Sequence, residues 1–117
     1  MATVSFLLRK DPEGVGTLAK RLCSDCVVRY EPASDSWVPM ESTPEALRDF
    51  RRISPEKAAM TRYKLRVAEC LTHCYGNSYL GDAAEKRVKH NELYVEYSFV
   101  AGIDPMDTAI EIGYSCG

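Results

Sequence analysis

Residues 54–77, SPEKAAMTRYKLRVAECLTHCYGN, predict the long helix around which the rest of the chain must be arranged. Ser54 can cap its N-terminus, and Pro55 suits the first helical position. Gly76 can adopt the left-handed conformation that commonly ends a helix. Apolar side chains recur at spacings of three and four residues, which is typical of a helix packed on a core. They are Met60, Tyr63, Val67, Cys70, Leu71 and Cys74.

The segment just before this helix predicts a second helix, over residues 43–53. Thr43 or Ser42 can cap it, and Pro44 fits its opening turn. Residues 18–22 predict a short helix, whereas residues 83–89 are compatible with either a short helix or a basic loop.

Alternating or β-rich runs predict strands on both sides of the two helices. The expected strands cover residues 4–8, 27–31, 36–40, 92–100 and 108–115. The pattern predicts an α+β protein with a mainly antiparallel sheet and two to three helices on one face. A chain of 117 residues with 45% hydrophobic and 27% charged residues is expected to form a single domain over residues 1–117.

Charge is distributed unevenly along a chain that is almost neutral as a whole, with 15 Lys and Arg against 17 Asp and Glu. Residues 48–66 carry seven cations and two anions. Residues 92–117 carry five anions and no cation. Such asymmetry indicates an interaction surface.

The basic segment therefore supplies the candidate binding residues, which are Arg48, Arg51, Arg52, Arg62 and Arg66. The expected partner is a macromolecule with an acidic surface, either a protein or a nucleic acid. Two alternatives remain open: a solvated helix face, or pairing within the protein with the acidic segment that begins at Glu92. A sequence pI of about 5.7 is low for a dedicated nucleic-acid binder.

Two cysteine pairs are candidate zinc ligands. Cys23 and Cys26 have the spacing with which two thiolates grip one ion, and Cys70 and Cys74 lie four residues apart on the predicted long helix. Together they predict one structural zinc ion, with His73 pointing away from that face. The alternative is that these are ordinary core or surface thiols, because free cysteine behaves as a small buried hydrophobe.

The sequence supports only general expectations about cellular location and catalysis. No apolar run is long enough to span a membrane, and residues 1–10 do not have the pattern of a signal peptide. An odd count of five cysteines argues against a complete disulfide framework, so an intracellular, cytoplasmic protein is expected. Only His73 and His90 are available for a Cys–His nucleophile, which gives an enzyme little support.

The leading functional hypothesis is a small non-enzymatic interaction or regulatory protein, of a kind that also suits a viral or phage accessory protein. A zinc-stabilised nucleic-acid-binding domain is the first alternative. A small enzyme whose site is assembled only in the fold is the second.

Overall fold

The computed structural model describes residues 4–80 and 82–114. It is an α+β protein with a five-stranded antiparallel sheet in the order β4-β3-β2-β1-β5, which confirms the predicted class. The strands are β1 (Ser5–Arg9), β2 (Thr17–Cys23), β3 (Cys26–Glu31), β4 (Ser36–Met40) and β5 (Arg51–Ile53). The helices are α1 (Pro44–Leu47), α2 (Pro55–Tyr75), the 3₁₀ turn η1 (Gly76–Tyr79), α3 (Ala83–His90), α4 (Glu92–Val100) and α5 (Pro105–Tyr114).

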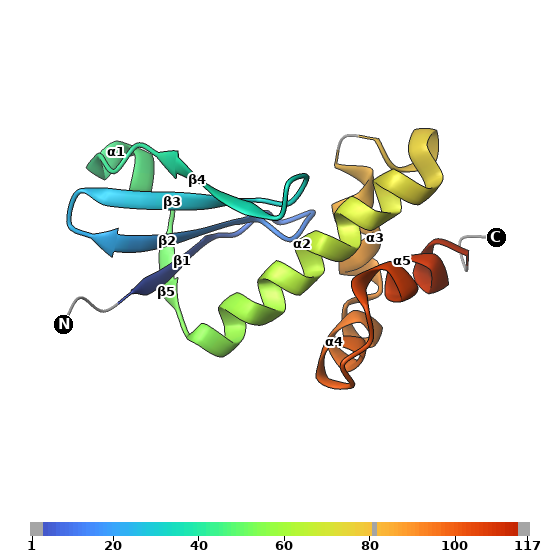
Figure 1. Ribbon diagram of the computed structural model, residues 1–117. Helices are drawn as coiled ribbons and strands as arrows, with labels where there is room; N and C mark the ends of the chain where they lie inside the picture. Colours follow the sequence, from blue (N-terminus) through green and yellow to red (C-terminus); the bar gives the residue numbers. More distant parts are fainter. Residues whose placement is uncertain (1–3, 81, 115–117) are drawn as a thin grey trace.

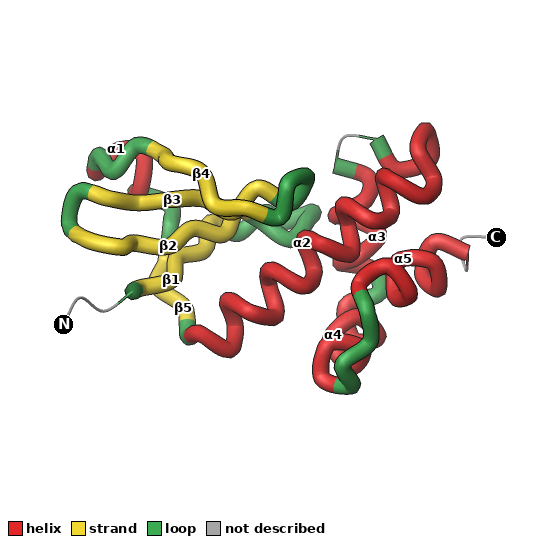
Figure 2. Tube along the Cα trace, in the orientation of Figure 1, coloured by secondary structure: helices red, strands yellow, loops and turns green. Residues whose placement is uncertain are grey.

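The molecule is elongated, with principal extents of 47 × 28 × 24 Å. Figure 1 shows the sheet at one end and α3, α4 and α5 gathered at the other. Helix α2 joins the two ends: it starts beside β5 and continues past the sheet into the helical end, as Figure 2 also shows. Within the described ranges, no helix combines the length and the apolar character needed to cross a bilayer.

The long helix has the predicted boundaries and caps. Ser54 Oγ accepts a hydrogen bond from the Lys57 amide at 3.1 Å, and Gly76 follows the last turn with φ of 49°. The N-terminal half of α2 packs on the sheet, in a core with Leu18, Tyr30, Ala58 and Leu65. Its C-terminal half forms a second core with α3, α4 and α5, which includes Val67, Leu71, Val88, Val95 and Ile112.

The two predicted C-terminal strands are wrong: residues 92–100 form α4 and residues 105–114 form α5. A strand would place Leu93 and Val95 on one face, but Val95 is completely buried and Leu93 is exposed. Asp104 Oδ1 accepts from the Met106 amide at 2.9 Å and starts α5. Both segments are helical because they complete the core around α2, and this tertiary packing overrides the β propensity of their Val, Ile and Tyr residues.

Two further element predictions are corrected. Residues 18–22 lie in β2, which pairs with both β1 and β3. Residues 43–53 do not form one helix: α1 ends at Leu47, the chain turns, and β5 begins at Arg51. The Phe50 amide donates to the Leu47 carbonyl oxygen at 3.0 Å in this turn, which places the Phe50 ring in the core beside Ala19 and Val27. Residues 83–89, for which the sequence allowed either a helix or a loop, are helical and lie in α3.

Candidate functional site

Helix α2 carries Arg62 and Arg66 one turn apart, on the side that faces the turn between β3 and β4. Arg62 Nη2 donates to Asp35 Oδ1 at 2.9 Å, and Arg66 Nη1 donates to the Pro32 carbonyl oxygen at 2.7 Å. The two guanidinium groups therefore fasten this turn to the helix. A guanidinium has five N–H donors, so each arginine retains donors for a ligand.

Arg62 is also part of a small polar cluster with Tyr30 and Asp35. The Tyr30 hydroxyl donates to Asp35 Oδ1 at 2.5 Å, and the Arg62 guanidinium lies 5.5 Å from the centre of the Tyr30 ring. Hydrogen bonds from Tyr30 and then Arg62 lower the pKa of Asp35. Burial, and then the hydrogen bond to Asp35, raise the pKa of Tyr30 to about 12. The carboxylate of Asp35 thus stays ionised and the Tyr30 hydroxyl stays protonated near neutral pH.

A groove of about 500 Å³ opens beside these arginines, between the β3–β4 turn, α2 and the α4–α5 connection. Tyr63 and Phe99 form an aromatic pair there, with ring centres 5.3 Å apart. The Tyr63 hydroxyl donates to the Ile103 carbonyl at 2.8 Å, which holds the aromatic wall in place. The lining is completed by Asp35, Ala59, Arg62, Arg66, Cys70, Asp104, Pro105 and Met106. The groove therefore combines apolar walls with two cations and two carboxylates.

The other three predicted binding arginines lie elsewhere. Arg48 follows α1, and Arg51 and Arg52 are exposed on β5, an edge strand of the sheet. Arg51 Nη1 donates to the carbonyl oxygen atoms of Arg48 and Phe50. The prediction of one basic helical face is thus corrected, because the predicted first helix is broken and its arginines lie at the sheet, away from Arg62 and Arg66 (Figure 1).

Internal pairing with the acidic segment, left open by the sequence, occurs at Lys64. Its Nζ lies 2.7 Å from Glu96 Oε2 and 3.4 Å from Glu92 Oε1. The hydrogen bond from Lys64 lowers the pKa of Glu96. These contacts join the middle of α2 to α4, so part of the charge asymmetry serves the packing of the helical end.

The four predicted zinc ligands are not brought together. Cys23 and Cys26 are exposed and face each other where β2 meets β3, whereas Cys70 and Cys74 lie on the C-terminal half of α2. Figure 1 shows these regions at opposite ends of the molecule. Within residues 4–80 and 82–114, no three His, Cys, Asp or Glu residues are grouped as metal ligands would be. The prediction of a four-cysteine site is corrected because paired spacing within each element does not bring the elements together.

Within residues 4–80 and 82–114, the histidines and cysteines give a Cys–His nucleophile no support. His73 and His90 are exposed on different helices. Cys74 Sγ contacts Met106 Sδ at 3.1 Å, and burial raises the pKa of the Cys70 thiol. A thiol with a raised pKa is a poor nucleophile at neutral pH.

Asp35, Ala59, Phe99 and Met106 are groove residues that the sequence did not single out. Asp35 lies between two of the expected strands, and Phe99 lies in the expected strand at residues 92–100. No local pattern links them to Arg62, since Asp35 lies 27 residues before it. Their assembly depends on how α2 lies across the sheet.

Comparison of the chain with protein-family models, with curated proteins and with solved structures finds no match. A function must therefore be inferred from the geometry described above.

Proposed function

We propose that the protein is a small non-enzymatic interaction domain, and that it binds a partner protein in the groove beside Arg62 and Arg66. The observation that carries this proposal is the combination, in one groove, of the Tyr63–Phe99 wall with two partly free guanidinium groups. A volume of about 500 Å³ is enough for one or two side chains of a partner. The partner segment that fits this groove carries an apolar side chain, for the aromatic wall, next to a carboxylate, for the two arginines.

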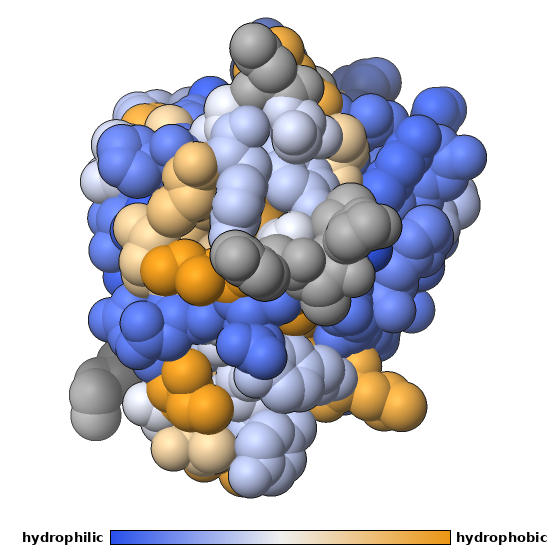
Figure 3. Space-filling view, turned by 90° about the vertical axis from the view of Figure 1, so that its right-hand side faces the viewer, coloured by the Kyte–Doolittle hydropathy of each residue, from blue (hydrophilic) through white to orange (hydrophobic). Residues whose placement is uncertain are grey.

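Exposed apolar side chains on α4 favour a protein over a nucleic acid. Leu93, Tyr97 and Val100 are 84%, 65% and 80% exposed. Their spacing of four and three residues places them on one side of the helix. Figure 3 shows apolar residues on the lower part of the helical end, where α4 lies. Clustered exposed apolar groups mark protein or membrane contact sites, whereas nucleic-acid binding depends mainly on contacts of cations with phosphates.

The proposal is tested by capturing partners from cell extract with the intact chain, with and without nuclease. A captured protein is then purified, and its dissociation constant is measured by titration calorimetry. We expect Arg62→Gln/Arg66→Gln to weaken binding about tenfold or more, because charge-assisted hydrogen bonds to a carboxylate are lost. Arg51→Gln/Arg52→Gln removes the same charge from β5 and serves as the matched control. We expect it to leave the dissociation constant unchanged.

Ala59 offers a second test that leaves the β3–β4 turn untouched. It is exposed on α2 and lines the groove. A carboxylate at this position repels an acidic segment, so Ala59→Glu is expected to weaken binding, whereas Ala59→Lys is expected to preserve or strengthen it. Equal effects of both variants, or binding that survives the double arginine variant, contradict the proposal. Nuclease-sensitive capture with a steep salt dependence points instead to a nucleic-acid partner.

A further inference from the structure

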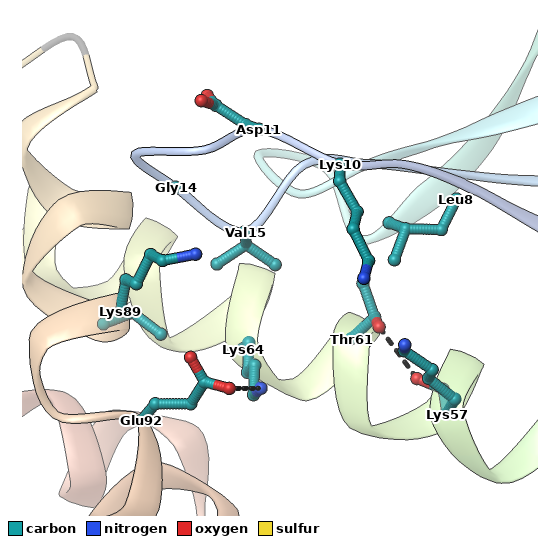
Figure 4. Close-up of a pocket in the computed structure, with 11 residues that line it drawn as sticks. Leu8, Lys10, Asp11, Gly14, Val15, Lys57, Thr61, Lys64, Lys89 and Glu92 are labelled. Atoms are coloured by element: carbon teal, nitrogen blue, oxygen red, sulfur yellow. Dashed lines mark hydrogen bonds and ion pairs between the residues drawn. The ribbon is translucent and has the colours of Figure 1, made fainter. Parts of the chain in front are cut away.

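A second cavity, of about 190 Å³, lies on a different side of α2 from the groove. It is partly open to solvent and is lined by the loop between β1 and β2, the first half of α2 and the region where α3 meets α4 (Figure 4). Its apolar wall comes from Leu8, Val15 and Val88, and Thr61 lies in its α2 wall. The charged residues are Lys10, Asp11, Lys57, Lys64, Lys89 and Glu92.

Three of these lysines have no ion-pair partner among the described residues: Lys10, Lys57 and Lys89. Figure 4 shows Lys10 and Lys89 reaching toward the cavity from opposite sides, while Lys64 is held by Glu92. Lys86 lies three residues before Lys89 on α3 and outside the cavity. Unlike Lys10, Lys57 and Lys89, it forms ion pairs, with Glu13 and Asp82. The unpaired lysines, all three of them exposed, thus line the rim of one partly open cavity.

The loop that forms one wall is fixed in position. Glu85 Oε1 on α3 accepts from the amides of Val15 at 2.9 Å and Gly16 at 3.2 Å. Gly16 has φ of 109°, and a Cβ atom there would collide with the Arg9 carbonyl oxygen. Two amides that could cradle an anion are therefore already occupied by a carboxylate. An anion in the cavity must be held by lysine side chains.

The net charge of the cavity selects the class of ligand. Among the residues that line the cavity, Glu92 balances Lys64, and Asp11 offsets one of the three remaining lysines. The excess is two positive charges, which matches the charge of a phosphate monoester at neutral pH, about −1.5 to −2. A volume of about 190 Å³ corresponds to about six water molecules, so the ligand must be small.

From this geometry we infer that the cavity binds a small phosphate-class dianion, either inorganic phosphate or a compact phosphate monoester. Lys10, Lys57 and Lys89 supply the charge, and the Leu8–Val15–Val88 wall accommodates a short organic group when one is present. Lys57 lies in the first turn of α2, where the positive end of the helix dipole makes a cation unfavourable. A bound anion offsets this unfavourable interaction. The inference is independent of the groove, since the two sets of lining residues do not overlap.

The test is a titration of the intact chain with inorganic phosphate and, separately, with glycerol 3-phosphate, at ionic strength held constant with potassium chloride. Calorimetry gives the constant, and amide NMR shifts locate the site. We expect saturable binding of one anion, with shifts at Val15, Thr61 and Lys89. Tighter binding of the ester places an organic group against the apolar wall, and equal binding identifies phosphate itself as sufficient.

Variants distinguish this cavity from general attraction to positive charge. Lys10→Gln/Lys89→Gln is expected to weaken binding at least tenfold, whereas Lys20→Gln/Lys86→Gln, with the same loss of charge outside the cavity, is expected to leave it unchanged. Asp11→Asn removes the opposing carboxylate but keeps the oxygen that accepts from the Glu13 amide, so it should tighten binding. Absence of saturable binding at millimolar anion overturns the inference. So does equal weakening by the two double variants, or no gain with Asp11→Asn.

Discussion

Asp35 does more at the scale of single residues than its place in an exposed turn suggests. Its φ of 48° lies in the left-handed region, which Asp and Asn tolerate better than most residues. Its Oδ1 atom accepts from both Tyr30 and Arg62. One carboxylate thereby shapes the turn, adds to the effect of burial in raising the pKa of Tyr30, and sets the position of Arg62 in the groove.

We predict that Asp35→Asn lowers stability only above acidic pH. The folded-state pKa of Asp35 is lowered, so its stabilising contribution is complete above the unfolded-state pKa of about 3.9 and is lost as pH falls through the folded-state pKa. Asn retains the left-handed backbone, and the pair is partly exposed, so the expected loss at pH 7 is about 1 kcal/mol or less. Urea titrations of both proteins from pH 7 downward measure this difference.

The difference in unfolding free energy between wild type and Asp35→Asn should shrink below about pH 4. In the variant, the pKa of Tyr30 should also fall from about 12, because the acceptor that holds its proton is no longer an anion. NMR titration of the Tyr30 ring resonances follows it. A constant stability difference across this range contradicts the assigned role of Asp35.

At the scale of elements, α4 shows that period-two hydrophobicity does not require a strand. Leu93, Val95, Tyr97 and Phe99 alternate with other residues, but the helix turns only some of them inward. Val95 and Ser98 are completely buried, and Phe99 packs on Tyr63. The nine side chains of α4 point in all directions around the helix and cannot all face the core, so Leu93 and Tyr97 remain outside.

We predict that truncating Val95 and Leu93 changes the free energy of unfolding by different amounts. In a strand the two side chains would share one face, and the two changes would be similar. Val95→Ala should destabilise the protein by about 1–3 kcal/mol, because it leaves a cavity in the core around α2. Leu93→Ala should change stability by about 0.5 kcal/mol or less, since its side chain is already in solvent. Chemical denaturation of both variants provides the comparison, and equal costs contradict the helical assignment of residues 92–100.

At the scale of the whole molecule, α2 is shared by two cores. Leu65 belongs to the sheet core, with Tyr30 and the neighbouring Trp37, and Leu71 belongs to the helical core. Val15 packs against both cores, and Glu85 ties its loop to α3. The sheet and the helical end are thereby joined by a continuous helix, a shared apolar contact and a loop.

This connection predicts that the chain unfolds as one cooperative unit. Leu71→Ala, in the helical core, should cost about 2–5 kcal/mol. The fluorescence of Trp37, in the sheet core, should report the same shift in denaturation midpoint as far-UV circular dichroism, which follows mainly the helices. Leu65→Ala provides the reciprocal variant. A Trp37 transition that does not move in Leu71→Ala would mean that the two ends unfold separately.

The sequence by itself determined the long helix and three strands of the sheet. Ser54, Pro55 and Gly76 act through local backbone geometry, so they mark the boundaries of α2 wherever the helix is packed. The strands at residues 4–8, 27–31 and 36–40 are likewise set by local patterns and turns. The α+β class followed from these elements.

Tertiary structure alone decided β2, β5, α4, α5 and both candidate sites. The short segments carry patterns that suit more than one conformation, and contacts with α2 or with neighbouring strands select between them. Spacing along the chain showed that Cys70 and Cys74 share a helix, but not how far they lie from Cys23 and Cys26. It likewise could not reveal that Asp35 meets Arg62 or that Lys10 faces Lys89, because such distances depend on how the elements are packed together.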